Sequence, residues 1–463
     1  MELQDAPRPR REVLAVLVGL LLGLFATVSS AMIVANALPA IAAGVGAGAA
    51  ESLWVVLASL VTMTVATPVW GKLADHRDKK RLTQAAILIF ILGSIGAALA
   101  PGLGVLVLMR ALQGVATGGL LAMSQAVLGV ITTPRQRGAY AGYLGAVMSV
   151  ATLCGPLLGG LVVDIPGLGW RWCFLLLLPL ALTALVIVQV TLRVPPSRGP
   201  LRLDVPGSLL LAVAVTALVA LLTLGGAWFP WLSIPAGALL AVAAGASAGF
   251  VLVERRVAEP ILAGRLLRES IPRWAIVGSI ALGVVTFSAI LYLSQYLQLV
   301  RGYPASAAGG LAAPMLAATM VGAIGGGHLV SRTGRLTAVL VTGSGLLVGG
   351  FAVLATVRDG TPDAVVVTAT VPVGLGIGLL MQNYVLAAQN AVGREWVGRV
   401  SGAVSLFRSL AGAVGVAGLG AVAGAAGGGA TGTAAVFTVS AGAGVLSLIA
   451  SIALGRRPLR TTL

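Results

Sequence analysis

The stretch Gly71-Lys72-Leu73-Ala74-Asp75-His76-Arg77-Asp78-Lys79-Lys80-Arg81 stands between two long apolar runs, 52–73 and 83–101. A helix needs about 20 mostly apolar residues to cross a bilayer, and both runs reach that length. The basic residues of the stretch are typical of a cytoplasmic loop, because Lys and Arg concentrate on the inner side of membranes. The stretch therefore predicts two transmembrane helices joined on the inner side.

The composition extends this interpretation to the whole chain. Of the 463 residues, 58% are apolar and only 10% are charged, whereas a soluble domain carries about 25% charged residues. The net charge of +16 would indicate nucleic acid if it lay along one face. Instead, the basic residues fall in short clusters between apolar runs. The sequence predicts an all-α integral membrane protein with no nucleic-acid partner.

Fourteen apolar runs are predicted to cross the membrane. They are 13–37, 52–73, 83–101, 103–131, 138–163, 172–192, 205–225, 229–253, 273–299, 306–331, 335–357, 363–388, 399–424 and 431–455. With the N-terminus in the cytoplasm, 25 of the 30 Lys and Arg fall in inner loops and tails. Arg110 and Arg408 fall within helices. This alternation predicts a multi-pass protein of the cytoplasmic membrane with both termini inside.

The longest inner connections, 193–204 and 254–272, divide the helices into six, two and six. We expect an N-terminal bundle at 13–192, a linker with two further helices at 193–272, and a C-terminal bundle at 273–455. A weaker copy of the first loop, Gly327-His328-Leu329-Val330-Ser331-Arg332-Thr333-Gly334-Arg335, follows the equivalent helix of the second bundle. Two copies at equivalent places indicate an internal repeat.

Two further motifs lie inside predicted helices. Arg110, Gln113 and Gly114 are spaced to share one helix face. An Arg near the middle of a membrane helix costs at least ~2.5–3.5 kcal/mol, so it needs a partner, a cavity or a substrate, unless it reaches the outer headgroups. The string Gly155-Pro156-Leu157-Leu158-Gly159-Gly160 predicts a kinked helix with a close-packing face, although plain small-residue packing also explains each glycine.

These motifs, in this order, resemble the fourteen-helix drug:proton antiporter family of the major facilitator superfamily. The resemblance covers about 33–415 and implies two six-helix bundles around a central cavity, plus two central linker helices. It implies alternating access and export of drugs, dyes or metabolites, with the 155–160 string as the antiport-type helix. It also implies that the repeated loop gates the inner side. The gating residues would be Gly71, Asp75, Lys79, Lys80, Arg81, Gly327, Arg332, Gly334 and Arg335.

The chain departs from that family in ways that bear on coupling. Asp78 and His76 replace a usual Gly and Arg in the first loop, where Asp75 is expected to favour a helix N-terminus. In helix 1, Ser30 stands where the family carries an Asp. None of the fourteen acids lies near the middle of a span. The usual proton carrier is therefore missing, and Asp75 or Asp164 would have to substitute.

The predicted cavity contains Arg110, with Arg408 as a second candidate, and no carboxylate. Such a cavity should favour anionic or neutral amphiphiles over lipophilic cations. The other candidate cavity residues are small or polar: Ser30, Asn36, Gln113, Gly114, Gln125, Gln295, Gln298, Gln382, Asn383, Gln389 and Asn390. The alternative for the amides is hydrogen bonding between helices, worth about 0.6 kcal/mol each.

Three functions remain open. The first is an exporter of small amphipathic molecules, working as a monomer in the bilayer and coupled to protons. The second is an uncoupled or exchange-type carrier of lipids or endogenous metabolites. The third is a sensor that transports nothing. We expect no enzyme activity, metal or cofactor, because no nucleophile–base pair, phosphate loop or ligand cluster is present in the sequence. Cys154 and Cys173 lie in apolar runs and are expected to be small core residues.

Overall fold

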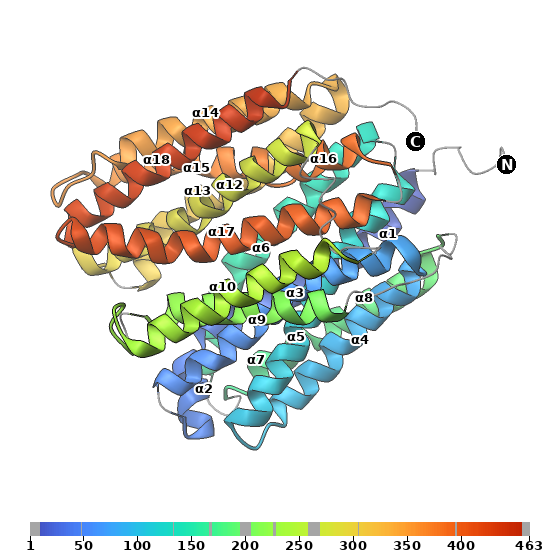
Figure 1. Ribbon diagram of the computed structural model, residues 1–463, viewed down its shortest axis with the longest axis horizontal. Coiled ribbons are helices and arrows are strands. Elements are labelled where there is room, and N and C mark those ends of the chain that lie inside the picture. The colour runs from blue at the N-terminus through green and yellow to red at the C-terminus, as the bar shows by residue number, and fades with distance from the viewer. Residues whose placement is uncertain are drawn as a thin grey trace. The chain divides into compact units, whose positions relative to one another are not determined.

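The computed structural model describes residues 10–47, 49–132, 134–165, 169–194, 205–225, 228–257, 269–303, 305–393 and 396–455. Over these residues the structure is helical (Figure 1), apart from an isolated bridge between Gly225 and Phe229. Eleven of the described helices are long and apolar enough to cross a membrane, and a further apolar helix at 206–222 is shorter. The prediction of a helical membrane protein is confirmed.

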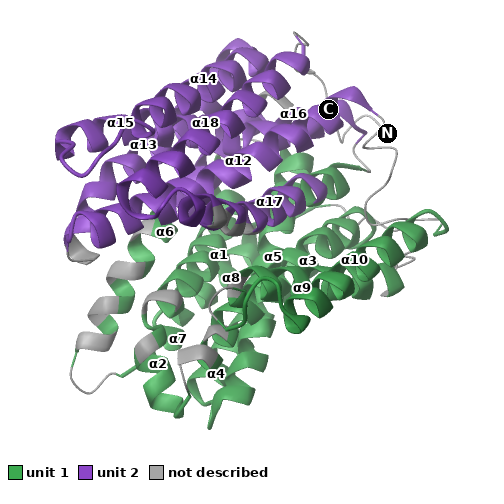
Figure 2. Ribbon diagram, turned by 60° about the vertical axis from the view of Figure 1, so that its left-hand side comes forward, with its two compact units in different colours: residues 1–133, 150–264, 394–402 green, residues 134–149, 265–393, 403–463 purple. Residues whose placement is uncertain are grey.

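The helices gather into two compact units (Figure 2). Unit 1 comprises 1–133, 150–264 and 394–402, and unit 2 comprises 134–149, 265–393 and 403–463. The helices of unit 1 are α1 Arg10–Asn36, α2 Leu38–Val45, α3 Ala49–His76, α4 Lys79–Ala98, α5 Leu103–Ile131, α7 Trp172–Leu175, α8 Leu178–Thr191, α9 Val205–Leu224 and α10 Ile234–Glu254. The helices of unit 2 are α12 Ser270–Gln295 with the π-helical turn η1 Tyr296–Val300, α13 Ala305–Thr333, α14 Leu336–Leu354, α15 Asp363–Met381, α16 Asn383–Ala391 and α18 Gly429–Ala453.

Two long helices are shared between the units. The first part of α6 Pro134–Asp164, at 134–149, belongs to unit 2, and its remainder belongs to unit 1. The first part of α17 Val397–Ala425, at 397–402, belongs to unit 1, and its remainder belongs to unit 2. Each of these helices therefore joins the two units covalently and without a loop.

Two predicted single helices are broken, and a third is followed by an additional short helix. The run 13–37 is followed by the short helix α2, whose second residue is Pro39. The run 172–192 forms α7 and α8, and Pro179 stands in the first turn of α8, where a proline is tolerated because that turn has no intrahelical partner for its N–H. The run 363–388 forms α15 and α16, which are separated at Gln382.

The two central linker helices differ in which helices of unit 1 they pack against. In unit 1, α9 packs on α3 and α10 packs on α9. Several large apolar side chains of α10 are exposed, among them Leu240, Val242 and Leu252. A helix that is apolar all round and exposed on most of its surface is suited to contact with lipid. The helix α10 therefore fits the membrane assignment, and α9 contains the shorter apolar helix at 206–222.

A ring of four hydroxyl groups lies in the buried interior of unit 2. Tyr384 Oη is 2.8 Å from both Ser447 Oγ and Ser451 Oγ. Ser344 Oγ closes the ring at 3.0 Å from each of those serines. All four residues are completely buried, and each hydroxyl can donate one hydrogen bond and accept another. The ring therefore ties α14, α16 and α18 together without burying a charge.

Candidate gating and transport sites

Asp75 lies at the N-terminus of α17. Its Oδ1 accepts a hydrogen bond from the backbone N–H of Gly398 at 3.1 Å, and its Oδ2 accepts one from that of Arg399 at 3.2 Å. The first backbone N–H groups of a helix have no partner within the helix, and the helix dipole favours an anion there. Asp75 is therefore a capping carboxylate that α3 supplies to another helix of unit 1.

Arg399 completes this contact. Its Nε lies 3.8 Å from Asp75 Oδ2, with the two side chains 8% and 4% exposed. Its Nη2 is 3.2 Å from His76 Nε2, and its guanidinium lies 4.6 Å from the centre of the Trp396 ring. The buried acid thus has both a helix terminus and a guanidinium as partners, as a buried charge requires.

Gly71 brings the same two helices into backbone contact. A Cβ on Gly71 would lie only 2.6 Å from the carbonyl oxygen of Gly398. The basic residues of this loop do other things. Lys79 is buried, Lys80 Nζ donates to the carbonyl of Gln189 at 2.7 Å, and Arg81 is exposed, 3.7 Å from Asp78. The described contacts with α17 are those of Gly71, Asp75 and His76.

The second copy of the loop makes an equivalent contact within unit 2. A Cβ on Gly327 would lie 2.1 Å from the carbonyl oxygen of Gly138, and one on Gly142 would lie 2.5 Å from that of Ala323. Gly334 ends α13 with a φ of +70°, a left-handed conformation that glycine adopts readily. Arg332 and Arg335 are exposed. In both copies, the leading glycine packs backbone to backbone on one of the two shared helices.

Arg110 is 1% exposed, and its hydrogen bonds stay inside unit 1. Its Nε donates to the carbonyl of Val55 at 3.0 Å, and its Nη1 donates to Gln113 Oε1 at 2.7 Å. Gln113 Nε2 in turn donates to Ser94 Oγ at 2.8 Å. This chain of bonds ties α3, α4 and α5 together. The guanidinium of Arg110 therefore has its partners inside the protein and does not reach outward to the lipid headgroups.

Gly114 serves packing in this structure. A Cβ there would lie 2.1 Å from Thr62 Oγ1 and 2.3 Å from the carbonyl oxygen of Ser59. Thr62 Oγ1 also donates to the carbonyl of Ala111 at 2.8 Å. Gly114 therefore lets α5 approach α3 closely, which explains why it follows Arg110 and Gln113 on the same face.

Ser30 is 1% exposed, and its hydroxyl has no hydrogen-bond partner among the described residues. Gly155 and Gly159 of α6 pack on the next turn of α1. A Cβ on Gly155 would lie 2.2 Å from Met32 Cβ, and one on Gly159 would lie 3.0 Å from the carbonyl oxygen of Ile33. The side chains of Asn36 and Pro156, and the surroundings of Gly160, lie outside the described residues.

The amide candidates of unit 2 divide into buried and exposed groups. Gln382, Asn383 and Gln389 are buried, and Asn383 Nδ2 donates to the carbonyl of Leu379 at 2.6 Å. Gln295 is exposed, and Gln298 Nε2 donates to Ser294 Oγ at 2.8 Å. In unit 1, Gln125 is partly buried.

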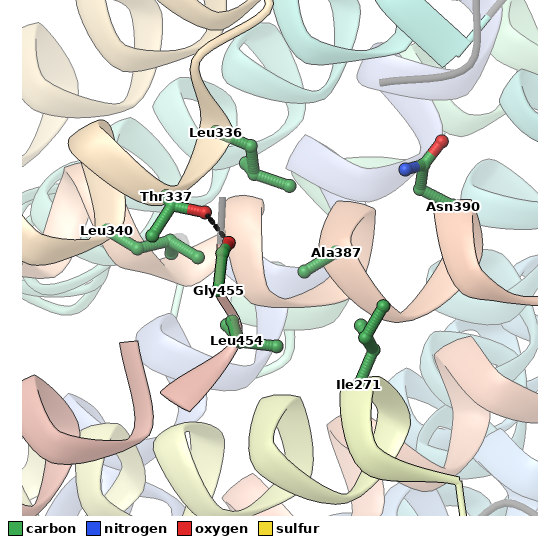
Figure 3. Close-up of a pocket in the computed structure, with 8 residues that line it drawn as sticks. All are labelled: Ile271, Leu336, Thr337, Leu340, Ala387, Asn390, Leu454 and Gly455. Carbon is green, nitrogen blue, oxygen red and sulfur yellow. Dashed lines mark hydrogen bonds between the residues drawn. The ribbon is translucent and has the colours of Figure 1, made fainter. Parts of the chain in front are cut away.

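Asn390 lines a small pocket between the ends of α12, α14, α16 and α18 (Figure 3). Its other lining residues are Ile271, Leu336, Thr337, Leu340, Ala387, Leu454 and Gly455. The pocket is mostly apolar, and one bond crosses its side, from Thr337 Oγ1 to the carbonyl of Gly455 at 2.6 Å. It offers no charged group to a ligand.

Arg408 lies at the break between α15 and α16. Its Nη1 donates to the carbonyl of Met381 at 3.1 Å, at the last residue of α15. Carbonyls at a helix end lack an intrahelical partner, so a guanidinium is a suitable one. Arg408 is partly exposed, in contrast to Arg110. It is therefore the more available of the two arginines within helices.

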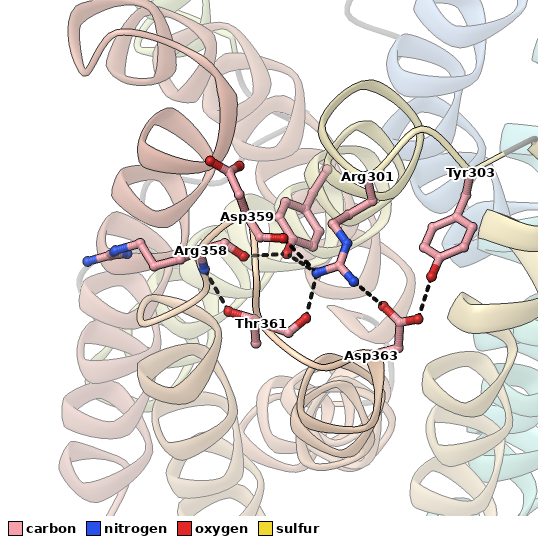
Figure 4. Close-up of polar contacts among 7 residues, drawn as sticks. Arg301, Tyr303, Arg358, Asp359, Thr361 and Asp363 are labelled. Atoms are coloured by element: carbon pink, nitrogen blue, oxygen red, sulfur yellow. Dashed lines mark hydrogen bonds and ion pairs between the residues drawn. The ribbon is translucent and has the colours of Figure 1, made fainter.

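A polar cluster that the sequence did not predict fastens the end of α12 to the start of α15 (Figure 4). Arg301 Nη2 is 2.9 Å from Asp363 Oδ1, and Arg301 Nη1 donates to the carbonyl of Asp359 at 3.0 Å. Tyr303 Oη donates to Asp363 Oδ2, and this bond raises the pKa of the Tyr303 phenol above its ordinary value. In the sequence, Arg301 is distinguished only as one of the five Lys and Arg that fall outside the predicted inner loops and tails.

The comparisons with known proteins agree with this geometry. The family model "Major Facilitator Superfamily" matches residues 20–416. The chain belongs to the major facilitator superfamily. This superfamily member is 31% identical over 404 residues to the multidrug transporter protein MdtP of Bacillus subtilis (strain 168), covering 87% of this chain and 74% of that protein. It is a transporter and not an enzyme.

Two further matches frame the comparison. An uncharacterized major-facilitator-type transporter of Mycobacterium tuberculosis (strain ATCC 25618 / H37Rv) is 34% identical, but the chain spans only 58% of its length and the match covers 87% of this chain. The crystal structure of the human organic anion transporter MFSD10 superposes with a TM-score of 0.67, at 16% identity, over 97% of this chain and 100% of that one. At that identity the likeness shows the superfamily fold alone.

Proposed function

We propose that this superfamily member exports small amphipathic molecules across the cytoplasmic membrane by alternating access. The observation that carries the proposal is the pair of equivalent backbone contacts, Gly71 on Gly398 in unit 1 and Gly327 on Gly138 in unit 2. Both copies of the repeated loop press a glycine onto a helix shared by the units. Alternating access is largely a rigid-body rocking of repeats, and contacts of this kind are suited to opening and closing as units. The likeness to the multidrug transporter protein MdtP of B. subtilis supports multidrug export.

The finer features of the proposal follow the sequence. We propose fourteen transmembrane helices in bundles at 13–192 and 273–455, a two-helix linker at 193–272, cytoplasmic termini, a monomer, and antiport with protons. The helices α9 and α10 supply the linker pair, since α10 touches the rest of unit 1 chiefly through α9. The runner-up function is a lipid or metabolite carrier that works by exchange or without coupling. A sensor that moves nothing is the least favoured function.

We further propose a preference for anionic or neutral substrates. Arg110 is held by Val55 and Gln113 and is closed off in this conformation. Arg408 donates a hydrogen bond to the carbonyl of Met381 and is partly exposed. Arg408 is therefore the cationic group that we assign to the substrate, and Arg110 is assigned to holding α3, α4 and α5 in place.

The test is dye uptake into inside-out vesicles that carry the protein. One lipophilic cation and one lipophilic anion are compared, with a proton gradient and after its collapse. We expect anion uptake that falls in Arg408→Gln and is unchanged in Arg358→Gln, which removes the same charge from an exposed loop. Gradient-dependent cation uptake that Arg408→Gln leaves intact would refute the substrate preference, although export itself would stand. Uptake of neither dye would argue against multidrug export.

A further inference from the structure

One row of side chains on α4 changes from charged to amide to apolar along the helix. Its members lie four residues apart and therefore share one face of the helix: Lys80, Gln84, Leu88 and Leu92. Both leucines are exposed, and Leu92 is 64% exposed. Exposed apolar side chains on a membrane-spanning helix contact lipid, so this row lies on the lipid-facing surface of unit 1.

The last turn of α8, which packs on α4 (Figure 1), lies beside the start of this row. Lys80 Nζ donates a hydrogen bond to the carbonyl of Gln189 at 2.7 Å, and Gln84 Nε2 donates to Gln189 Oε1. On α8, Val186 and Leu182 precede Gln189 by about one and two turns. Both are exposed, Val186 to 62%. The two helices therefore present an apolar surface with a lysine and two amides at one end.

Further basic residues surround that end of the surface. Arg81, the next residue of α4, has a side chain that is 88% exposed. Arg193 follows the end of α8 and is also exposed. Of the acids, Asp78 caps α4 and lies 3.7 Å from Arg81. Glu12 stands beside Arg11 in the first turn of α1, which packs on α8. Basic groups therefore outnumber acids at this end.

We propose that this surface of α4 and α8 binds one anionic phospholipid. The lipid phosphate lies at Lys80 and Arg81, and the acyl chains lie along the apolar side chains. The ester groups lie at the level of Gln84 and Gln189. Clustered Lys and Arg attract anionic lipids, and a guanidinium can bind a phosphate with two hydrogen bonds. Among the described residues, Lys80 Nζ has one acceptor, whereas an ammonium group has three N–H donors.

The spacing along α4 matches the dimensions of a lipid. At about 1.5 Å per residue, Leu92 lies roughly 18 Å from Lys80 along the helix. Half of the hydrocarbon core of a bilayer is about 15 Å thick, so the row extends from the headgroup level to near the midplane. The preference of basic residues for the inner side explains Lys80 and Arg81. It does not explain two amides on a lipid-facing surface, whereas the ester carbonyls of a lipid can accept hydrogen bonds from amide N–H groups.

The corresponding surface of unit 2 lacks these groups. There, Thr337, the second residue of α14 as Lys80 is of α4, donates to the carbonyl of Gly455 after α18. The residues that continue this row at intervals of four carry neither a charge nor an amide: Val341, Gly345 and Gly349. The lipid site is therefore specific to unit 1 and is not a consequence of the repeated fold.

The first experiment measures lipid binding to the full chain in detergent by native mass spectrometry. Phosphatidylglycerol is compared with phosphatidylcholine of the same acyl chains, and we expect phosphatidylglycerol to bind more tightly. Lys80→Gln and Arg81→Gln should each weaken its binding about fivefold, the size expected for one basic residue at an anionic lipid surface. Gln at position 80 keeps an N–H donor for the carbonyl of Gln189. The matched control is Arg256→Gln, which removes an exposed arginine after α10 in the same unit and should leave binding unchanged.

The second experiment locates the lipid on the unchanged chain, so it does not depend on the folding of a variant. Phosphatidylglycerol with a photoreactive diazirine in one acyl chain is added to the protein in nanodiscs of phosphatidylcholine. We expect crosslinks in peptides covering 79–98 and 178–191, and fewer of them when unlabelled phosphatidylglycerol competes. The inference rests on the proposed orientation only for the leaflet, which would be the cytoplasmic one.

Three results would overturn the proposal. They are equal binding of the two lipids, variants at Lys80 and Arg81 that behave like Arg256→Gln, and crosslinks confined to other helices. Displacement of the lipid by inorganic phosphate alone would also overturn it, because the site would then bind an anion and not a lipid. Absence of dye transport would bear on the proposed function alone, because neither experiment requires a transported substrate.

Discussion

The capping of α17 by Asp75 predicts a large and local effect of removing one charge. The variant Asp75→Asn keeps the shape of the side chain but leaves one acceptor oxygen. The new amide group would then face one of the two backbone N–H groups, at Gly398 or Arg399, that now donate to the carboxylate. It would also leave the guanidinium of Arg399 without its acid.

The magnitude follows from burial. Asp75 and Arg399 are 4% and 8% exposed, so the pair is poorly screened by solvent. Removing one partner of a buried ion pair costs about 3–5 kcal/mol, because the other charge stays buried and uncompensated. A hydrogen bond to a charged group is worth about 1.5–3 kcal/mol, but this overlaps with the pair. We therefore expect Asp75→Asn to lower the free energy of unfolding by about 3 kcal/mol.

Asp78→Asn is the matched control, because it makes the same substitution three residues away. Asp78 caps α4 by accepting a bond from the N–H of Lys80 at 2.8 Å, and Asn caps helices about as well as Asp. Its ion pair with the exposed Arg81 contributes little. The assay is reversible denaturant unfolding in detergent micelles. Equal changes of under about 0.5 kcal/mol in both variants, a size typical of ordinary surface substitutions, would refute the assignment of Asp75 as a buried capping acid.

Three further predictions concern unit 2. Gly327→Ala should destabilise the protein or block transport, because its Cβ would meet the carbonyl of Gly138 at 2.1 Å. Gly325→Ala on the same helix has open space and should be neutral or slightly stabilising. Thermal unfolding and dye uptake compare the two variants. Tyr384→Phe should cost about 1–3 kcal/mol, because it opens the hydroxyl ring and leaves buried serines short of a partner; denaturant unfolding measures this, and no change would show that the ring is dispensable. Asp363 holds the pKa of Tyr303 above its ordinary value of about 10, so the stabilisation from this bond is complete below that value and lost as the pH rises through the raised pKa. Asp363→Asn should therefore let the Tyr303 phenolate form at lower pH, which absorbance difference spectra against Tyr303→Phe would detect.

The sequence predicted the helices well where hydropathy alone decides them. The run 103–131 is α5, and the run 205–225 closely matches α9. The sequence did not predict the breaks between consecutive helices, because the hydropathy does not change at those breaks. Gln382 separates α15 from α16 inside one apolar run. The carbonyl of Met381 accepts a hydrogen bond from Arg408 of α17. No residue within 363–388 predicts that partner.

The sequence predicted the kind of contact that the candidate residues make better than the element that each of them contacts. The expectation that Asp75 would seek a helix N-terminus agrees with its position, but the helix is α17, more than 300 residues later in the chain. Arg110 and Gln113 share a face as their spacing requires, yet their bonds to Val55 and Ser94 close them off from any cavity in this conformation. Spacing fixes which residues share a face of one helix. It does not say what lies opposite.

The missing acid of helix 1 connects these observations. Ser30 is buried and its hydroxyl has no partner among the described residues, so a carboxylate in its place would carry a heavy desolvation cost unless it were paired. The chain avoids that cost and has no acid near the middle of any predicted span. With antiport as we propose, anion uptake should fall when the proton gradient is collapsed, and a group other than an acid in the middle of a span would then have to carry the proton. Uptake that survives the collapse would instead favour the exchange-type or uncoupled carrier over the antiporter.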